Sequence, residues 1–370
     1  MSDSNWYEVE NVKSVATPAL LVYPDRIKKN IETMLAIAKE PDRLRPHIKT
    51  HKIAEIVDLQ IKRGITKFKC ATIAEAELLG LSGAKDILLA MQPVGNNIDR
   101  FFKLIENFPN SKFSTIVDCQ EVIQEFGETA KEKELRVSLW LDINNGMNRT
   151  GVLPNERSIA LYQLVHNHSH LIAEGLHVYD GHIHESNFDK RKEICDKAFE
   201  PVLQLKNQVE TLGMRVKTIV AGGTPTFPIH INRDNVEVCP GTSLLWDYGY
   251  GSMYTDLQFL PAAVLLGQII SKPKKNLICL NLGHKALAAE MAFPRGKILN
   301  IENCQQVGHS EEHMVIECDD SNRYSVGDLC YVLPTHICPT VAKYKSVLTV
   351  KEKEINDSWV VAARDHKINI

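Results

Sequence analysis

The chain has 370 residues, which is too long for one ordinary compact core, although a barrel takes up to about 250 residues in a single domain. Its 43 Lys and Arg residues against 46 Asp and Glu give a net charge of −3, which does not favour nucleic acid or an acidic membrane surface as a partner. The polar N-terminal segment does not read as a secretory signal, and no apolar run reaches the roughly 18 residues that a membrane helix needs. With nine scattered cysteines and no CxxC pair, we expect a cytoplasmic protein with reduced thiols.

From about residue 16 to 245, short β-rich runs alternate with helical stretches. The first run, 19–23, opens this part of the chain. Eight further strand candidates follow it, at 45–49, 65–71, 86–92, 113–118, 136–143, 171–180, 215–221 and 235–239. Alternation of strands and helices predicts a parallel sheet, and eight strands predict an α/β fold of the (β/α)8 TIM-barrel type over residues 16–250. An open doubly wound sheet is the alternative.

After residue 250 the pattern changes to β-rich runs separated by turns, without long amphipathic helices. These runs lie at 262–272, 276–282, 312–318, 328–333, 346–350 and 359–364. We therefore predict a C-terminal antiparallel β domain over residues 251–370, to which residues 1–15 are also assigned.

A lysine ends the first barrel strand. Active sites of barrels lie at the C-terminal ends of strands, where an amine can be desolvated and made nucleophilic. Lys49 ends the run 45–49, whereas Lys52, three residues later, faces another way and opens the following segment. We therefore prefer Lys49 as the reactive amine; the alternative interpretation is a basic surface strand.

Two loops of small residues follow predicted strands 7 and 8. Gly222, Gly223 and Thr224 end the seventh strand, and Gly241 and Thr242 follow the eighth. Barrels frequently bind phosphate in these two loops, through backbone N–H groups. Either loop alone could be an ordinary turn, but a phosphate anchor opposite an amine indicates a phosphorylated aldehyde, pyridoxal 5′-phosphate (PLP).

Other polar side chains lie at the same predicted barrel mouth. Arg149, in a Gly-rich loop, could donate to the phenolic oxygen of the cofactor, or it could be a helix-initiating surface arginine. Tyr179 could pack on the cofactor or hydrogen-bond near it, or be an ordinary barrel-mouth aromatic. Of His177, His182 and His184, two are expected to serve packing or hydrogen bonding.

Five motifs together resemble the alanine-racemase-type (fold-type III) PLP enzymes, and more closely the branch with D-serine dehydratase and D-threonine aldolase. They are RPHIKTHK at 45–52, GMNRTG at 146–151, YDGH at 179–182, GGTPT at 222–226 and PGT at 240–242. The resemblance implies that Lys49 forms the internal aldimine and that Arg149 contacts the phenolic oxygen. It further implies a homodimer and a phosphate site formed by Gly223, Thr224, Gly241 and Thr242.

In the predicted β domain, His336 and Cys338 are two residues apart on a segment that we expect to be extended. Residues i and i+2 of a strand point to the same side, so the imidazole and the thiolate could coordinate one ion. Such a pair alone is common, but the resemblance implies a divalent metal beside the cofactor. A thiolate favours Zn²⁺, with Mn²⁺ as the alternative. The stretch Ser310–His313, with Glu311, Glu312 and His313, also resembles a family motif and is assigned to a supporting or interface role.

Two departures from the racemase pattern disfavour racemisation. Alanine racemases carry an arginine where this chain has Cys239, and the β domain has no convincing Gly-Tyr setting for a second base; Gly249-Tyr250 directly follows strand 8. We therefore predict a PLP- and metal-dependent lyase acting on D-3-hydroxy amino acids, similar to D-serine dehydratase, which gives pyruvate and ammonia. A D-threonine aldolase is the alternative. A non-catalytic PLP-binding protein of cofactor homeostasis is the alternative of another class, against which the β domain argues.

Overall fold

The computed structural model describes residues 5–370 and divides into two compact units. The first unit comprises residues up to 33, residues 50–56 and residues 242–364. The second comprises 34–49, 57–241 and 365–370. Helices α1 (Pro24–Ala38) and α2 (Ala54–Ile61) each begin in the first unit and end in the second.

The second unit contains a sheet of seven parallel strands that pair in sequence order. They are β2 (Lys67–Cys70), β3 (Asp86–Leu89), β4 (Lys112–Val117), β5 (Val137–Ile143), β6 (Leu171–Val178), β7 (Thr218–Ala221) and β8 (Val236–Val238). A doubly wound sheet would reverse its strand order at a switch point. The order β2 to β8 has no such reversal, so the predicted α/β barrel architecture is confirmed over its alternative.

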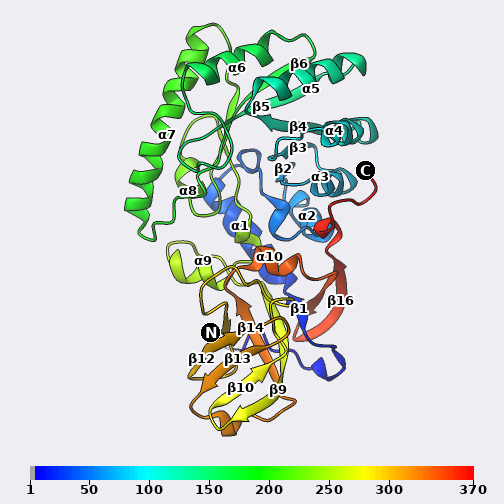
Figure 1. Ribbon diagram of the computed structural model, residues 1–370, viewed down its shortest axis with the longest axis vertical. Helices are drawn as coiled ribbons and strands as arrows, with labels where there is room; N and C mark the ends of the chain where they lie inside the picture. The colour runs from blue at the N-terminus through cyan, green and yellow to red at the C-terminus, as the bar shows by residue number, and fades with distance from the viewer. Residues whose placement is uncertain (1–4) are drawn as a thin grey trace. The chain divides into compact units, whose positions relative to one another are not determined.

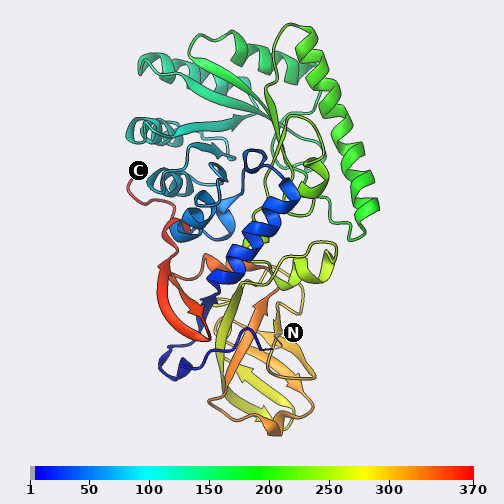
Figure 2. The same ribbon diagram turned by 180° about the vertical axis from the view of Figure 1, so that it is seen from behind.

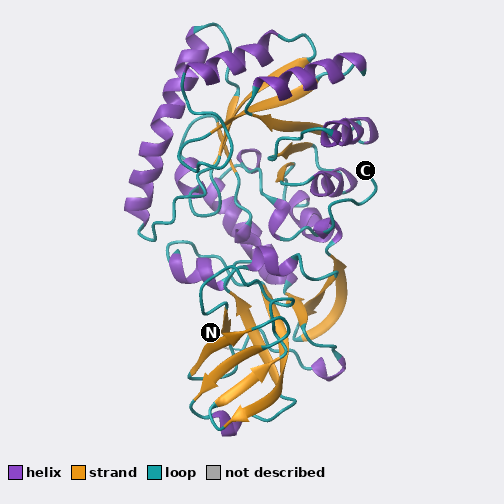
Figure 3. Cartoon of the chain, viewed as in Figure 1, coloured by secondary structure: helices purple, strands orange, loops and turns teal. Residues whose placement is uncertain are grey.

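Helices connect the strands of the second unit and lie outside the curled sheet (Figure 1 and Figure 3). They are α3 (Ile73–Leu81), α4 (Asn96–Asn107), α5 (Gln120–Glu132), α6 (Glu156–Asn167), α7 (Phe188–Thr211) and the short α8 (Phe227–His230). Side chains at their starts define several of them: the Thr72 hydroxyl accepts from the Glu75 N–H, and the Asn187 amide oxygen accepts from the Lys190 N–H. Because the strands are parallel, each helix returns the chain to the end of the sheet where the next strand begins.

The predicted strand 45–49 is wrong as a regular strand. Leu44 and His47 form isolated parallel bridges to Val238 of β8 and Lys69 of β2, and residues 48–50 turn into a 3-10 helix. Pro46 explains the irregularity, because proline has no N–H to give to a ladder; its carbonyl still accepts from the Lys69 N–H at 2.9 Å. The segment 44–47 thus closes the barrel between β8 and β2 without being a strand.

A cluster of charged residues lies at the end of the barrel where the strands begin. The Arg45 side chain is only 1% exposed and forms ion pairs with Glu237 and Asp86, each at 2.7 Å. Lys67 pairs with Glu237 at 2.6 Å. We call these four residues the bottom cluster. The Arg45 guanidinium also lies 5.7 Å from the ring centroid of Trp140, which belongs to the apolar interior of the barrel.

The first unit contains a nine-stranded sheet, drawn from its two sides in Figure 1 and Figure 2. Its strands are β1 (Ala19–Val22), β9 (Ala263–Lys274), β10 (Leu277–Leu280), β11 (Gly296–Ile298), β12 (Cys304–His309), β13 (Met314–Cys318), β14 (Leu329–Pro334), β15 (Ser346–Lys351) and β16 (Glu354–Val360). The pairs are antiparallel except that β1 runs parallel to β15, so the sheet is mixed. The run predicted at 359–364 is wrong, because β16 ends at Val360 and residues 362–364 form a 3-10 turn.

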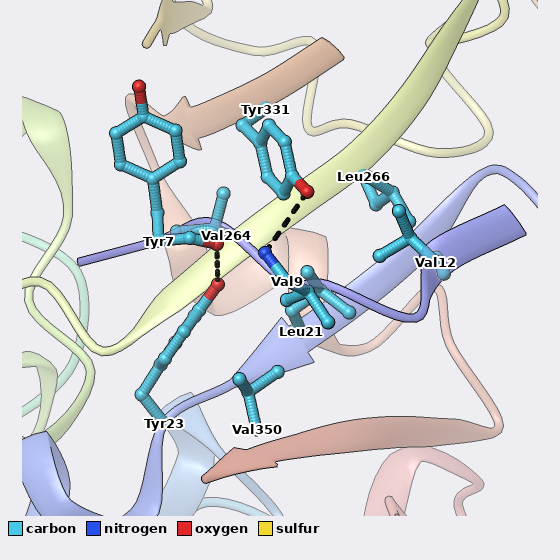
Figure 4. Packing of buried hydrophobic residues seen from close by; sticks show 10 residues of the cluster. Tyr7, Val9, Val12, Leu21, Tyr23, Val264, Leu266, Tyr331 and Val350 are labelled. Carbon is cyan, nitrogen blue, oxygen red and sulfur yellow. Dashed lines mark hydrogen bonds between the residues drawn. The ribbon is translucent and has the colours of Figure 1, made fainter. Parts of the chain in front are cut away.

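An apolar cluster joins the N-terminal segment to this sheet (Figure 4). Tyr7 and Val9 pack with Val264 of β9 and with Tyr331 of β14. Two hydrogen bonds fix the segment: the Tyr331 hydroxyl accepts from the Val9 N–H, and the Tyr23 hydroxyl donates to the Tyr7 carbonyl. The N-terminal residues from Tyr7 onward therefore belong to the core of the first unit.

The first unit also contains two short helices, α9 (Tyr248–Met253) and α10 (Ile337–Val341). Across residues 5–370, no helix is long and apolar enough to span a membrane. All nine cysteines are free thiols.

Candidate active site

A cavity of about 470 Å³ lies in the second unit, lined by side chains from the ends of β2, β5 and β6 and from the segment 47–49. Three of the predicted site residues line it: Lys49, Arg149 and Tyr179. The cavity also contains His177 and a residue that the sequence analysis missed, Lys69. Its volume is in the range of small-molecule sites.

Three cationic side chains converge on one aromatic ring in this cavity. The Lys49 Nζ lies 5.8 Å from the centroid of the Tyr179 ring, the Lys69 Nζ 5.4 Å and the Arg149 guanidinium carbon 5.1 Å. Lys49 sits in the 3-10 turn Ile48–Thr50, where its N–H donates to His47 Nδ1 at 3.3 Å. Lys52, the rejected candidate, belongs to the first unit.

Glycines hold the Tyr179 ring in place. A Cβ at Gly181 would lie 2.4 Å from a ring carbon of Tyr179, and a Cβ at Gly223 would lie 3.3 Å from the ring. The glycine of the YDGH motif is therefore required by the close approach of this ring. The two glycines come from the loops after β6 and β7, so the ring is packed between two strand ends.

The loops predicted to bind phosphate lie together. Gly222 has a φ of +73°, and a Cβ there would meet both His230 and Thr226 at 2.8 Å, so only glycine fits without strain. The Thr224 hydroxyl accepts from the Gly241 N–H at 3.0 Å and links the loop after β7 to the loop after β8. Thr242 begins the segment 242–364 of the first unit, where its hydroxyl lies 3.6 Å from the Cys338 sulfur.

Three buried side chains below the β7 loop offer metal-type ligand atoms within 4.8 Å of one another: Asp180, Cys195 and His230. Their hydrogen bonds indicate a structural role instead. His230 Nε2 bonds to Asp180 at 2.8 Å while its Nδ1 accepts from Arg233 at 3.2 Å, and the Thr226 hydroxyl donates to Asp180 at 2.8 Å. Because these atoms are already satisfied, the cluster fixes the Gly222–Thr226 loop. Its members are far apart in the chain, so no local sequence pattern indicates the cluster.

A buried pair, Asp142 and His177, lies at the ends of β5 and β6, with Asp142 Oδ1 and His177 Nδ1 2.6 Å apart. Burial raises the pKa of Asp142, but the charge and hydrogen bond of His177 outweigh it and the net pKa is lowered. Burial, followed by the charge of Lys69, lowers the pKa of His177. Asp142 Oδ2 and His177 Nε2 are buried and have no hydrogen-bond partner among the described residues. They are open to a polar ligand.

The other two histidines of the motif have different places. A Cβ at Gly146 would lie 2.8 Å from His182 Nε2, so His182 packs beneath the Gly-rich loop that carries Arg149. His184 is exposed. Glu311 and Glu312, from the stretch assigned a supporting role, form ion pairs with Lys285 at 3.2 and 2.7 Å in the first unit.

The predicted metal ligands lie next to each other, but the expected extended segment is wrong. His336 is the residue before α10, and Cys338 is in the first turn of that helix. Burial lowers the pKa of His336, but hydrogen bonds to Cys338 and then Glu290 outweigh it and raise the pKa to about 9. His336 Nδ1 is 2.5 Å from Glu290, a further candidate ligand that the sequence analysis missed because it is 46 residues away.

The Cys338 sulfur is held by two hydroxyl groups of the first unit. The Thr50 hydroxyl lies 3.1 Å and the Thr242 hydroxyl 3.6 Å from it. Thr50 directly follows Lys49 in the chain, and Thr242 directly follows Gly241. The sulfur, imidazole and carboxylate at this place form a donor set that suits a divalent transition metal.

Residues 22–249 match the family described as the N-terminal domain of alanine racemase, and residues 262–350 match a putative serine dehydratase domain. The chain belongs to the alanine racemase family. The predicted resemblance to the fold-type III PLP enzymes is thereby confirmed. The predicted enzyme class, a PLP-dependent lyase, and the cofactor are confirmed at the level of the family.

The chain is similar over most of its length to an aldolase and to a dehydratase. It is 24% identical to a D-threonine aldolase from Arthrobacter sp., covering 95% of this chain and 93% of the relative. It is 22% identical to the D-serine dehydratase of Dictyostelium discoideum, covering 95% and 96%. Aldolases and dehydratases therefore both occur among the relatives of this chain.

Solved structures share the fold. The D-threonine aldolase from Filomicrobium marinum superposes with a TM-score of 0.88 at 24% identity, covering 95% of each chain. A cysteine-to-alanine mutant of D-threo-3-hydroxyaspartate dehydratase, solved in its metal-free form, gives a TM-score of 0.83 at 20% identity, covering 94% of this chain and 97% of the other. At these identities the likeness establishes the fold alone.

Proposed function

We propose that this chain is a PLP- and metal-dependent lyase of D-3-hydroxy amino acids that removes water from D-serine to give pyruvate and ammonia. The observation that carries the proposal is the cavity in which Lys49 faces Tyr179 beside two further cations. Such a concentration of positive charge fits a small anionic cofactor and an amino acid substrate.

The residues present suit PLP. Lys49 would hold the aldehyde carbon of the cofactor, Arg149 its phenolic oxygen, and the two joined loops its phosphate, through Gly222, Gly223, Thr224, Gly241 and Thr242. The glycine at 222, with its left-handed backbone, supports this assignment, because it lets the backbone approach an anion closely. When bound, PLP supplies an electron sink for the charge that develops at Cα.

The protein side chains then divide the remaining work. The Lys49 amine is positioned to take up the Cα proton of the substrate, since it lies in the same cavity as the groups that would orient the ring. Tyr179, wedged between Gly181 and Gly223, would present a fixed aromatic surface to the cofactor and keep water away from it. The unpartnered Asp142 Oδ2 and His177 Nε2 would meet polar atoms of the bound molecule.

We assign the metal to His336 and Cys338, with Glu290 as the adjacent carboxylate. Zinc is preferred because a thiolate is a soft ligand, and manganese is the alternative. A divalent ion held there would polarise the β-hydroxyl of the substrate as it leaves. The metal-free structure of a cysteine-to-alanine mutant dehydratase supports a cysteine ligand in this group of proteins.

Retro-aldol cleavage to glycine and an aldehyde is the second candidate, favoured by the similarity to D-threonine aldolase. The thiolate at Cys338, together with the serine dehydratase domain at 262–350, favours dehydration. The second domain also argues against a non-catalytic PLP-binding protein. We further expect a cytoplasmic homodimer, with a small D-amino acid as its substrate.

Incubating the purified protein with D-serine and D-threonine, with and without added zinc, tests the proposal. We expect pyruvate or the corresponding keto acid, with ammonia, to appear in the zinc-containing samples. Glycine with an aldehyde would establish the aldolase instead. Turnover of neither substrate class, in protein that contains both cofactor and zinc, would contradict the lyase proposal.

A further inference from the structure

One nitrogen of a buried histidine in the cavity is still unaccounted for. His177 belongs to the end of β6 and lines the cavity, and its side chain is 4% exposed. Its Nε2 is buried and has no hydrogen-bond partner among residues 5–370. A buried polar atom without a partner is costly, so such an atom in a cavity indicates a ligand that supplies the missing hydrogen bond. The function proposed above does not say which ligand atom does so.

The neighbouring carboxylate decides which nitrogen of His177 carries the hydrogen. Asp142 Oδ1 lies 2.6 Å from His177 Nδ1. Burial raises the pKa of Asp142, but the charge and hydrogen bond of His177 outweigh it, so this group is a carboxylate near neutral pH. A carboxylate only accepts, and Nδ1 must therefore donate. Burial, followed by the charge of Lys69, lowers the pKa of His177, so the ring carries no second hydrogen. Its Nε2 is then an acceptor.

The protein itself supplies no donor to this acceptor. Lys69 and Arg149 line the same cavity and disfavour a second proton on His177, but within the described part of the chain neither donates to its Nε2. Because the bond to Asp142 fixes both the orientation and the tautomer of the ring, Nε2 presents a preorganised lone pair. It is available to an N–H or O–H donor of a bound molecule.

The polar groups of PLP narrow the choice of that donor. They are the aldehyde, the phenolic oxygen, the phosphate and the ring nitrogen. The proposed function gives Lys49 to the first, Arg149 to the second and the loops after β7 and β8 to the third. The ring nitrogen remains, and in its protonated form it is a donor that needs an acceptor. Cys239 is no substitute, because its thiol packs in the apolar cluster of the barrel and burial raises its pKa.

We propose that His177 Nε2 accepts a hydrogen bond from the protonated ring nitrogen of PLP, with Asp142 holding the imidazole in the tautomer that can accept. His177 then contacts the cofactor, and Asp142 is a positioning residue that acts through His177. A proton kept on the ring nitrogen makes the ring a stronger electron sink. The inference rests on the proposed function, because it takes PLP, held by Lys49, as the occupant of the cavity.

The test compares PLP with its deaza analogue, in which a C–H group replaces the ring nitrogen. Equilibrium dialysis of the full-length protein, freed of cofactor beforehand, gives a dissociation constant for each. We expect the wild type to prefer PLP by about 10- to 100-fold, the range for a hydrogen bond to a charged group. Equal affinities would overturn the inference. This comparison needs no substitution, so it remains decisive if a variant does not fold.

Three variants assign the preference to the histidine and its tautomer. In His177→Asn the amide N–H can replace Nδ1 as the donor to Asp142, but no acceptor is left where Nε2 lies, so the preference should be lost. His177→Gln can place its amide oxygen near that position and should retain most of it. Asp142→Asn can donate to Nδ1 and thereby move the ring hydrogen to Nε2, so it should lose the preference as well.

His184→Asn is the matched control, because His184 follows in the same motif but is exposed. It should keep the wild-type preference. Nitrogen NMR of PLP labelled at the ring nitrogen gives a second readout that a purely structural role of His177 would not move. We expect the protonated nitrogen in the wild type and in His184→Asn, and the unprotonated nitrogen in His177→Asn.

The remaining outcomes separate the inference from the proposed function. If the preference survives in His177→Asn and disappears only in Asp142→Asn, the carboxylate is the partner and the inference about His177 is overturned. If His177→Asn raises the KM for the substrate and leaves both cofactor constants unchanged, Nε2 serves the substrate, which also overturns it. In both cases the proposed function stands. Wild-type protein that does not hold PLP at Lys49 would contradict the proposed function itself.

Discussion

The two ends of the barrel in the second unit treat buried charge differently. At the bottom, Arg45 and Lys67 are paired with Asp86 and Glu237 over distances of 2.6 to 2.7 Å. At the mouth, Lys49, Lys69 and Arg149 gather around Tyr179, and none of the three forms an ion pair with a described residue. Both ends are built from the same strands, and β2 supplies one lysine to each.

This difference distinguishes the end of the barrel that serves stability from the end that serves function. A buried charge is tolerated when ion pairs with its neighbours compensate for its desolvation, as they do at the bottom. At the mouth no ion pair between described residues compensates for the lost hydration of the charges. Two further buried atoms, Asp142 Oδ2 and His177 Nε2, also have no hydrogen-bond partner among the described residues. Uncompensated polar groups in a cavity are typical of a binding site, and in barrels the site is expected where the strands end.

Apart from the loss of Lys49 itself, the largest expected effect comes from outside the barrel. Removing the metal with a chelator, or changing Cys338 to Ala, should lower lyase activity by about 10³-fold, because a Lewis acid contributes several kcal/mol to the leaving of a hydroxyl. The absorbance at about 415 nm of PLP linked to Lys49 should remain in the loaded protein, since the barrel mouth is not altered. Adding zinc back should restore the chelated wild type but not Cys338→Ala.

Cys338→Asp is the matched variant for the metal. It should retain a site whose preference moves from zinc toward manganese, since a carboxylate is a harder ligand. Full activity in a rigorously metal-free preparation would remove the metal from the reaction and return His336 and Cys338 to a structural role.

At the bottom of the barrel, Arg45→Ala should lower the free energy of unfolding by about 3–5 kcal/mol, the cost of leaving buried carboxylates without their partner. Urea denaturation measures this change. The cavity should not be affected, so the Arg45→Ala protein that remains folded should take up PLP as the wild type does. Loss of cofactor binding without loss of stability would break the distinction between the two ends.

The opposite sign is expected at the mouth, with a smaller effect. Lys69→Met should raise the free energy of unfolding of the cofactor-free protein by about 1 kcal/mol, because an uncompensated charge leaves the interior. Burial lowers the pKa of Lys69 in the folded protein below that of the unfolded chain. The penalty is therefore complete at low pH and disappears as the pH rises through that lowered pKa toward 10.5, so the two proteins should converge in alkaline solution.

Strand–helix alternation was enough to predict the barrel and the separate β domain, because hydrophobic periodicity is a local signal. Local signals fail where a contact across the chain decides the structure. Pro46 interrupts the predicted first strand, although the segment still bridges β8 and β2. The spacing of His336 and Cys338 predicts an extended segment, whereas a short helix begins there.

The parts of the site that the sequence did not indicate are those whose meaning depends on burial. In the sequence, Lys69 is one lysine of a KFKC run that also contains Lys67, and nothing local distinguishes the paired lysine from the unpaired one. The period of two in a strand could have suggested that both lysines face the barrel interior. The bond between Asp180 and His230 joins residues 50 positions apart and has no local signature.

Borohydride reduction of the PLP-loaded protein, followed by peptide mapping, tests the central claim most directly. The account predicts one labelled peptide in which Lys49 carries the reduced cofactor, and the same label in a Lys52→Ala variant. Lys49→Ala should give no labelled peptide and should lose at least about 10⁴-fold in activity, the scale seen when a reactive nucleophile is removed. A label on Lys52 with Lys49 intact, or no label in active wild-type protein, would contradict the account.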